Sequence, residues 1–600
     1  MNKKPAHNFH IPVMGLAYTI DSPIRVAQFG ISSVVSIIDD EIIERMRDFY
    51  SKKFNFDYTA ISIKSEDHRA ERITAYLDMM DDIVTKKFKD FKEEISKNTE
   101  TLKQFIGMLP STSDLKDGLQ NILNKKDNLS ESIKNFIDHN FNPGEIDVNI
   151  MTKVDKDNFI KNVQLPTIYN DAHASLRGFA NSKLSSSVIF SAGMNPRLYS
   201  YLEEFEDFFP NENGELKKKI ILKVSDFRSA MIQGNFLAKK GLWVSEYRIE
   251  SGLNCGGHAF ATDGLLMGPI MEEFKQKKNE LQTSAFTLWK SALEQKGKMT
   301  TSEPLEIKIS VQGGVGTSEE HDFLLSNYNA DSVGWGSPFL LVPEATSLDQ
   351  ETRNLLTKAK EEDYYLSNMS PLGVPFNTVR GTSNDEIKDV NISNQKFGSS
   401  CPKKFLALSK EFTPKGTCTA SKKYQDIKLN ELETNKLNFT DKQYEKSKKN
   451  ITDKSCLCVG LANSAYLEQG LPIKGEKQGV VICPGPNLGF FDKEVSLSEM
   501  VRHIYGYENV LQDDRRPHLF INELKLYVDY FKNEIVEFSE EITKSQVKKW
   551  ESFKGNLLKG IAYYEELFAE TNHFKPKLDS IFSDLKSFKL KLEKIKIPQL

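Results

Sequence analysis

The residues of this 600-residue chain that are best suited to chemistry form two glycine-rich turns, each at the end of an apolar run. The first turn, Gly313-Gly314-Val315-Gly316, follows residues 306–312, and the second, Gly336-Ser337, ends the short run 330–335. Glycines let backbone N–H groups come close to an anion, and a helix that starts there adds its positive end. Two such turns one strand–helix unit apart predict a phosphate site at the mouth of a (β/α)8 barrel, although two ordinary turns of an α/β protein are the alternative.

A third turn carries a histidine. Gly256-Gly257-His258 follows the strand that begins at Trp243, so the imidazole is expected at the same mouth of the barrel. An imidazole there can act as a general base or hydrogen-bond a substrate oxygen near neutral pH. Taken alone, the motif fits a histidine that merely caps a loop.

Strands that alternate with helices must position these turns. Apolar, β-branched runs predict strands at residues 9–14, 31–38, 185–194, 219–224 and 243–248, and the phosphate-turn unit closes the series. Alternation of this kind predicts parallel β/α units with right-handed crossovers. The sequence shows about six of the eight units of an α/β (β/α)8 TIM barrel, which we expect within residues 1–365.

Three further segments lie outside the barrel pattern. Residues 45–165 are charged, with apolar residues at three- and four-residue steps from Ile73 to Ile95, and we expect a helical insertion in a barrel loop. Residues 366–510 are loop-rich, contain five of the six cysteines, and should pack on the barrel. Residues 511–600 carry apolar residues in a four-three spacing, which predicts a helical hairpin, with a short dimerising coiled coil as the alternative.

The composition bounds the class of protein. Lys and Arg total 80 and Asp and Glu total 84, so the net charge of −4 gives no basic excess that would call for nucleic acid. No apolar run approaches the roughly 20 residues of a membrane span, and the N-terminus has no signal-peptide core. Six cysteines in a chain of this length do not make a disulfide framework. The expectation is a soluble protein of the reducing cytoplasm.

The histidine turn and the two phosphate turns resemble one enzyme family. Residues 251–258 resemble the Gly-x-Glu-Ala-Gly-Gly-His signature of nitronate monooxygenases, the 2-nitropropane dioxygenase-like flavoproteins, and of the related FMN-dependent enoyl-acyl-carrier-protein reductases. Residues 312–315 look like the Ala-Gly-Gly-Ile turn of that family, and residues 330–340 look like its Gly-Ala-Asp-Gly-Val-x-x-Gly-Thr-x-Phe-Leu. Residues 11–15 are similar, less closely, to its opening strand. The resemblance covers about 9–40 and 185–346.

The resemblance implies a TIM barrel, FMN and redox chemistry. His258 would face the reactive edge of the flavin as the catalytic residue. The residues that would bind the cofactor are Met14, Gly15 and Leu16 beside the isoalloxazine, Lys223 on a central strand, Gly256 and Gly257 in the histidine turn, and Gly313, Gly314, Gly336 and Ser337 around the phosphate.

Three positions of the histidine turn depart from the family signature. Asn254 stands where the family has Glu, Ser251 where it has Gln, and Cys255 where it has Ala. The lost carboxylate changes the polarity expected beside the flavin, which leaves the substrate less certain than the cofactor. Cys255 is either a small packing residue or a thiol near the flavin.

The loop-rich segment offers a second candidate site. Cys401, Cys418, Cys456 and Cys458 could together hold zinc or an iron–sulfur cluster, because thiolates are the preferred ligands of both. The chain has no Cys-x-x-Cys pair and the gaps are long, so reduced structural thiols are the alternative.

Three functions follow from these patterns. The first is oxidation of a small anionic carbon acid, such as an alkyl nitronate, by the flavin and O₂. The second is reduction of an enoyl group in fatty-acid or polyketide synthesis, with NAD(P)H as reductant and an acyl carrier protein as partner. The third is a non-catalytic barrel scaffold, which predicts no bound flavin.

Overall fold

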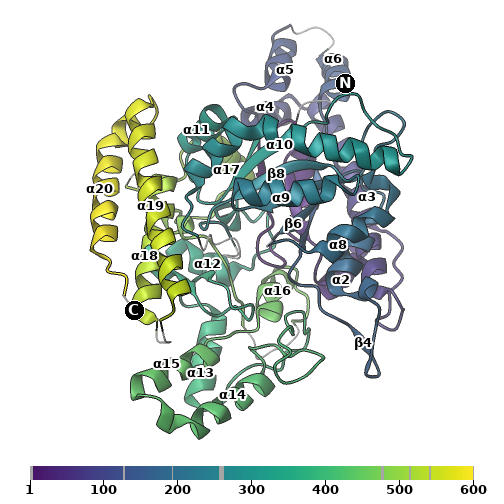
Figure 1. The fold of residues 1–600 in the computed structure, drawn as a ribbon. Helices are drawn as coiled ribbons and strands as arrows, with labels where there is room; N and C mark the ends of the chain where they lie inside the picture. The colour runs from purple at the N-terminus through teal and green to yellow at the C-terminus, as the bar shows by residue number, and fades with distance from the viewer. Residues whose placement is uncertain are drawn as a thin grey trace.

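The computed structural model describes residues 5–125, 129–191, 193–255, 263–473, 479–511, 515–538 and 542–598. Eight parallel strands close into a barrel in the order β1-β2-β3-β6-β7-β8-β9-β10, with β10 pairing back to β1 (Figure 1). The fold predicted from the sequence, an α/β (β/α)8 barrel, is therefore confirmed. The barrel strands are β1 (Phe9–Ile11), β2 (Ser32–Ser36), β3 (Ile146–Met151), β6 (Ser187–Ser191), β7 (Lys219–Val224), β8 (Val244–Glu250), β9 (Lys308–Gln312) and β10 (Ser332–Gly334).

Helices cover the outside of the barrel, so its strands are buried on both faces. In β2, every residue after Ser32 is buried, as expected for a strand with the barrel interior on one side and helices on the other. The covering α-helices and 3-10 helices (η) are α1 (Ser22–Val26), η1 (Ala27–Phe29), α2 (Asp40–Phe54), η2 (Thr167–Tyr169), α7 (Asp171–Ala180), α8 (Pro196–Tyr201), η3 (Leu202–Glu204), η4 (Glu206–Phe208), α9 (Phe227–Ala238), α10 (Met267–Gln295), α11 (Ser318–Tyr328), η5 (Ser337–Leu341) and α12 (Gln350–Lys358).

The helical insertion is shorter than the sequence suggested. Strand β3 lies inside the range 45–165 that was assigned to the insertion, and it pairs with β2 on one side and β6 on the other. The polar residues Asp147 and Asn149 interrupt its apolar run and hide the strand from a search for apolar periodicity, yet both are buried. A two-stranded hairpin, β4 (Phe159–Ile160) with β5 (Val163–Gln164), follows in the same range.

The insertion itself is a helical unit with a core of its own. Its helices are α3 (His68–Lys97), α4 (Thr99–Met108), α5 (Asp114–Lys125) and α6 (Leu129–Asn140). The predicted amphipathic stripe of α3 is confirmed, because Ile73, Leu77, Met80 and Ile95 are all buried. A separate apolar cluster that includes Phe105 joins the far end of α3 to α4, α5 and α6.

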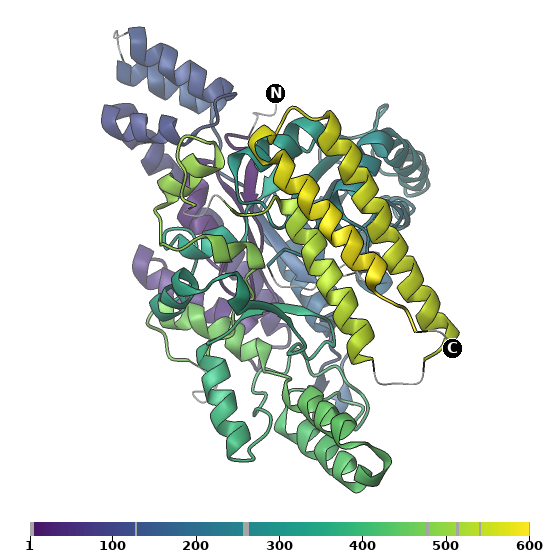
Figure 2. The ribbon, with the colours of Figure 1, turned by 90° about the vertical axis from the view of Figure 1, so that its left-hand side faces the viewer.

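The chain after the barrel forms a cap and a layer of long helices. The cap contains β11 (Tyr364–Ser367) paired with β12 (Phe376–Val379), then α13 (Ser383–Ser393), α14 (Lys422–Thr434), η7 (Lys436–Asn438), α15 (Asp441–Thr452), α16 (Leu457–Glu468), η8 (Pro486–Phe490) and α17 (Leu497–Ile504), with η6 (Glu361–Asp363) before it. The C-terminal layer consists of α18 (Leu519–Glu537), α19 (Lys544–Glu570), η9 (Lys575–Lys577) and α20 (Leu578–Lys594). In both ribbon views α5 and α6 lie at the opposite end of the molecule from α14 and α15 (Figures 1 and 2).

One apolar core joins the barrel, the cap and the C-terminal helices. It contains Val333 of the barrel, Val481 of the cap and Phe531 of α18. Helix α18 contacts α19, α20 and α10, so its four-three spacing serves packing within the chain. Where the sequence suggested a hairpin over 511–600, three long helices are present.

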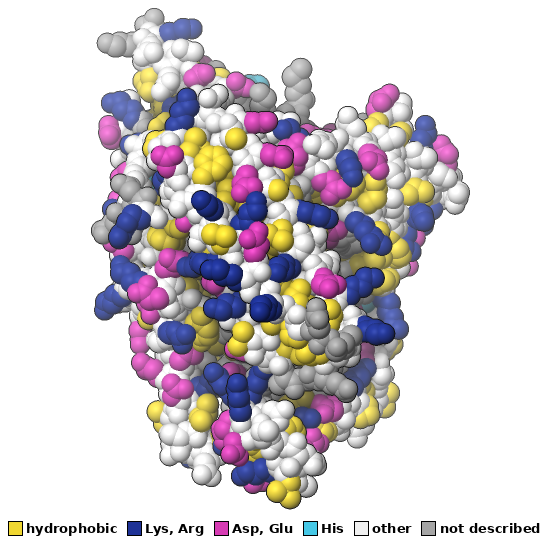
Figure 3. Space-filling view, turned by 60° about the vertical axis from the view of Figure 1, so that its left-hand side comes forward, with side chains coloured by type: hydrophobic (Ala, Val, Ile, Leu, Met, Phe, Trp, Pro, Cys, Tyr) yellow, Lys and Arg dark blue, Asp and Glu magenta, His cyan; other side chains and the backbone are white. Residues whose placement is uncertain are grey.

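The surface mixes charges of both signs. Figure 3 shows Lys and Arg side chains interspersed with Asp and Glu and with hydrophobic ones on the face that it presents. Among the described residues, no helix has both the length and the apolar character that a bilayer crossing demands.

Gly144, which follows Pro143 at the entry to β3, offers a test of this packing. A Cβ atom built on Gly144 falls 1.9 Å from the Ile31 carbonyl oxygen, a backbone atom that cannot move aside alone. Gly144→Ala should therefore lower the thermal midpoint by the equivalent of about 1–3 kcal/mol. In Gly555→Ala, a matched control in α19 with open space around its Cβ, stability should stay equal or rise. Equal midpoints for both variants would show that the contact at Gly144 is not tight.

Candidate functional site

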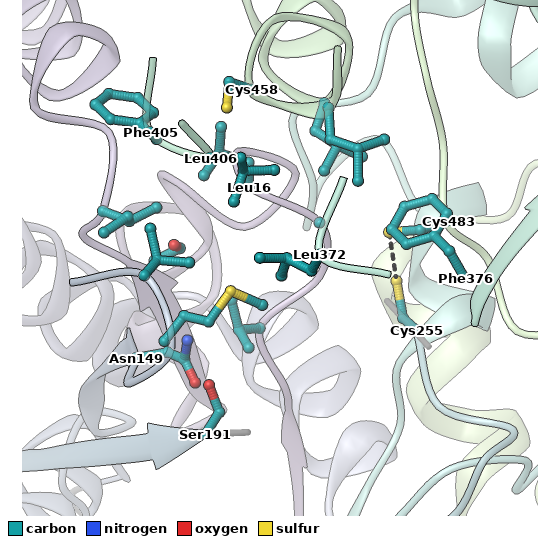
Figure 4. A pocket seen from close by; sticks show the side chains of 18 of the residues that line it. Leu16, Asn149, Ser191, Cys255, Leu372, Phe376, Phe405, Leu406, Cys458 and Cys483 are labelled. Carbon is teal, nitrogen blue, oxygen red and sulfur yellow. Dashed lines mark hydrogen bonds between the residues drawn. The ribbon is translucent and has the colours of Figure 1, made fainter. Parts of the chain in front are cut away.

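A pocket opens where the carboxyl ends of the barrel strands meet the cap. Residues from six strands or the turns that follow them line its floor, and apolar residues of the cap form its roof (Figure 4). The floor consists of Val13, Gly15, Leu16, Ser36, Ile38, Asn149, Met151, Val154, Ser191, Lys223, Glu250, Asn254 and Cys255, and the roof of Leu372, Phe376, Phe405, Leu406, Leu457, Cys458, Leu461 and Cys483. The space between them, counted with its mouth, is about 950 Å³. This is the end of a barrel at which active sites are found.

A buried carboxylate organises the polar side of the floor. Glu250 Oε1 lies 2.6 Å from Lys223 Nζ and accepts hydrogen bonds from Asn254 Nδ2 at 2.7 Å and from Gln312 Nε2 at 2.5 Å. The Lys223 and Glu250 side chains are 9% and 6% exposed, so the two charges depend on each other for solvation. Glu250, four residues before Asn254, thus places a carboxylate in the floor of the pocket.

Asn149, at the carboxyl half of β3, faces the pocket with an unused acceptor. Its side chain is buried, and its Oδ1 atom has no hydrogen-bond partner among the described residues. Figure 4 shows the amide of Asn149 beside the hydroxyl of Ser191 at the base of the pocket. A buried polar atom without a partner costs free energy, so this amide is positioned to receive a donor from a bound molecule.

The two glycine turns beside the pocket present free backbone donors. Gly313 and Gly314 have φ values of +114° and +84°, which glycine adopts at little cost. No hydrogen bond involving the N–H groups of Gly313, Gly314 or Gly336 is found within the described part of the chain. Unpaired N–H groups at the ends of neighbouring strands are available to an anion.

A segment of the cap lies beside the second of these turns. The N–H of Gly485 donates to Ser337 Oγ at 2.8 Å, which leaves the Ser337 hydroxyl proton free to donate elsewhere. A Cβ atom on Gly485 would fall 2.1 Å from the Leu253 carbonyl oxygen, so the segment fits only because residue 485 is glycine. Two prolines, Pro484 and Pro486, flank it and restrict its backbone.

A buried arginine fixes the first glycine turn from behind. Arg516 donates to the Gly314 carbonyl oxygen at 2.6 Å, to Asn487 Oδ1 at 2.6 Å and to Glu320 Oε1 at 2.7 Å. Glu320 in turn accepts the Gly316 N–H at 2.9 Å. Burial alone would raise the pKa of Glu320, but Arg516 beside it holds that pKa below its ordinary value. The turn is therefore held by charge-assisted hydrogen bonds from the C-terminal part of the chain.

A carboxyl group of α18 holds the histidine turn in the same way. Glu523 accepts hydrogen bonds from Ser251 Oγ at 2.7 Å and from the Met267 N–H at 2.8 Å. The side chain is fully buried and has no cationic partner among the described residues, and burial raises the pKa of Glu523 to about 7. Ser251, where the family signature has Gln, and Gly252, whose N–H donates to Tyr527 Oη at 3.2 Å, thus both join the turn to α18.

The structure brings most of the predicted cofactor residues to this mouth. Gly15, Leu16 and Lys223 line the pocket. Gly336 lies between the pocket and the turn after β1, because a Cβ on it would contact Pro12, Met14 and Asn254. Gly313, Gly314 and Ser337 adjoin the same region as described above. Gly256, Gly257 and His258 lie outside the described residues, so the role of His258 stays a prediction.

The predicted metal site is not formed. Among the described residues, no group of three or more His, Cys, Asp or Glu side chains could hold a metal ion, and all six cysteines are free thiols. Cys401 and Cys418 belong to one small apolar cluster, whereas Cys456 and Cys458 pack in another with Phe405. The cysteines serve the apolar packing of the cap, which is the alternative that the long sequence gaps favoured.

Sequence reasoning missed three residues of the site. Asn149 and Glu250 each sit near the end of a strand that contacts the pocket, and a polar residue in an otherwise buried strand was the available signal. Arg516 had no signal, because its partners are about 30 to 200 residues away in the sequence.

Comparison with known proteins concerns the fold. No family model and no curated protein matches this chain. The enoyl reductase domain of MlnA from the macrolactin biosynthesis cluster of Bacillus amyloliquefaciens is similar at 14% identity and a TM-score of 0.32, covering 69% of this chain and 86% of that one. The nitroalkane oxidase of Streptomyces ansochromogenes is similar at 11% identity and a TM-score of 0.29, covering 63% and 84%. Both TM-scores are below 0.5, so neither likeness carries an argument about this chain.

The Lys223–Glu250 pair can be tested by a double-mutant cycle. Glu250→Leu leaves the buried Lys223 ammonium without its counter-charge, which costs about 3–5 kcal/mol in comparable sites. Lys223→Met in the Glu250→Leu background removes that unpaired charge and should recover part of the lost thermal midpoint. A double variant that melts below the single Glu250→Leu variant would show that the two charges are not coupled.

The raised pKa of Glu523 predicts a pH dependence of stability. The folded chain favours the protonated carboxyl, so stability from this residue is complete below its ordinary pKa of 4.5 and is lost as pH rises through about 7. Glu523→Gln keeps an acceptor and a donor but cannot ionise. At pH 8 the variant should melt above the unmodified protein by the equivalent of roughly 3 kcal/mol, with the difference shrinking toward pH 5. Parallel midpoints at both pH values would contradict a raised pKa.

Proposed function

We propose that this chain is an FMN-dependent oxidoreductase that reduces the double bond of an enoyl thioester. The observation that carries the cofactor is the set of unpaired N–H groups at Gly313, Gly314 and Gly336, beside a pocket at the barrel mouth. These donors and the Ser337 hydroxyl fit a phosphate, and the orphan Asn149 oxygen fits a polar ring edge. FMN, when bound, supplies hydride transfer.

The character of the roof supports a substrate with an apolar chain. Leu372, Phe376, Leu406 and Leu461 line the pocket with aliphatic and aromatic carbon, which can cover an acyl chain and exclude water from it. A small anionic substrate would have no need for so large an apolar roof.

The charges of the pocket lining also favour an enoyl thioester over a nitronate as substrate. Within the described lining, the charged side chains are Lys223 and Glu250, and they neutralise each other at 2.6 Å. A nitronate carries a negative charge that would need a free cation in the pocket. The enoyl group of a thioester is neutral and needs only a hydrogen-bond donor at its carbonyl oxygen.

Nitronate oxidation is the second candidate, and the motif Gly256-Gly257-His258 keeps it open. A protonated His258 imidazole would be the cation that the described lining does not offer. In the reductase, the same histidine would hold the substrate carbonyl oxygen or deliver a proton to it. NAD(P)H and an acyl carrier protein are partners of the reductase only, so the electron donor separates the two candidates.

The first test asks whether the purified protein binds FMN. The purified protein should show the two visible flavin absorption bands and release FMN on heating. Gly336→Val places a branched side chain beside Pro12 and Asn254 and should weaken FMN retention at least about tenfold. Because Gly336 has φ −98° and ψ −94°, outside the usual helical and extended regions, the thermal midpoint of the variant is measured alongside. Gly555→Val in α19 is the matched control and should keep its flavin. A colourless protein that does not take up FMN would contradict the proposal and favour the hypothesis of a non-catalytic barrel scaffold.

The second test separates the two reactions. Anaerobic mixing of the flavin-loaded protein with NADPH or NADH should bleach the flavin, and an added short enoyl thioester should restore its colour. Bleaching by ethylnitronate, with no response to either nicotinamide, would replace the reductase by nitronate oxidation.

A further inference from the structure

Two of the six cysteines meet inside the pocket. Cys255 Sγ lies 3.5 Å from Cys483 Sγ, and both residues line the pocket (Figure 4). Cys255 ends the described part of the turn after β8, and Cys483 belongs to the cap segment that closes over Ser337. The two residues are 228 positions apart, so the fold alone brings them together.

We propose that Cys255 and Cys483 form a redox-active dithiol in the wall of the pocket, which small disulfides convert reversibly into an internal disulfide. The sulfur atoms are already in contact, so a bond between them requires only a small approach of two loops. Cys255 stands where the resembling family has Ala, which makes the pair a feature of this chain.

The surroundings decide which thiol reacts first. Cys483 is 0% exposed and Cys255 8% exposed. Contact with Cys255 and burial hold the pKa of the Cys483 thiol well above its ordinary value, so Cys483 is the weaker nucleophile toward a molecule in the pocket. Cys255 is the entry point, and Cys483 is the resolving thiol.

The chemistry balances with a low-molecular-weight disulfide as oxidant. The Cys255 thiolate attacks one sulfur of the small disulfide, forms a mixed disulfide and releases one small thiol. Cys483 then loses its proton and attacks Cys255 Sγ, which forms the internal disulfide and releases the second small thiol. The chain loses two electrons and two protons, and the small disulfide gains them.

The disulfide would join two parts of the site that touch the predicted cofactor region. Cys483 lines the pocket together with Gly15, and Tyr18 Oη donates to the Val481 carbonyl oxygen at 2.6 Å in the same cap segment. Oxidation would therefore link the turn after β8 covalently to the cap segment that lies next to the turn after β1. The inference does not rest on the flavin, because the covalent state of two sulfur atoms is measured directly.

The test is disulfide mapping of the full-length protein. The folded chain, with and without added FMN, is equilibrated with oxidised and reduced glutathione over a range of ratios, alkylated, digested and analysed by mass spectrometry. The expected product is one cross-linked peptide pair containing Cys255 and Cys483, lacking two hydrogen atoms and restored by dithiothreitol, while the other four cysteines are alkylated.

Matched variants separate this pair from general oxidation. Cys255→Ala and Cys483→Ala should each abolish the cross-link, whereas Cys418→Ala, a buried cysteine of the cap outside the pocket, should leave it unchanged. The mapping of the unsubstituted chain stands by itself if a variant fails to fold. Full alkylation of Cys255 and Cys483 at every glutathione ratio, a glutathione adduct on Cys255 that goes no further, or a cross-link between Cys401 and Cys418 instead would overturn the proposal.

Discussion

A buried guanidinium connects the three parts of the chain on which the pocket depends. Arg516, at the start of the C-terminal layer, is fully enclosed by Glu320 of the barrel, Asn487 of the cap and the carbonyl oxygen of Gly314. Burying a guanidinium costs free energy unless its N–H donors are hydrogen-bonded. Here the hydrogen bonds that satisfy the cation also fix the position of a glycine turn. The first glycine turn is thus held from outside the barrel, by a residue just before the C-terminal helices.

The cap is bonded to the barrel mouth on several sides, which makes the pocket an interior space. The buried Lys403 ammonium pairs with Asp39 at the start of α2, Asn377 Nδ2 donates to the carbonyl oxygens of Gly252 and Asn254, and the Gly485 N–H donates to Ser337. A covered pocket of this kind limits the access of water to whatever binds in it. The same bonds place the cap in the path of any molecule that enters the pocket from that side.

The sequence predicted those features that local chemistry determines. Strand runs such as residues 31–38, the glycine turns at 313 and 336, and the amphipathic helix α3 have signals within a few residues, and each is present. Strand β3 was missed because Asp147 and Asn149 broke its apolar pattern, although barrel closure buries them. The pairing of Arg516 with Glu320 and of Cys255 with Cys483 is set by tertiary packing over hundreds of residues, which no local pattern encodes. The cysteines gathered in the loop-rich segment suggested a metal site. In the structure their side chains pack in two apolar clusters instead.

The central claim is that the two glycine turns hold the phosphate of a flavin. Titration of the flavin-free protein with FMN and with riboflavin, followed by flavin fluorescence, tests it directly, because the two ligands differ only in the phosphate. The account predicts that FMN binds at least about a hundredfold more tightly, as expected when several N–H donors bind a dianion. Equal affinity for FMN and riboflavin would contradict that claim.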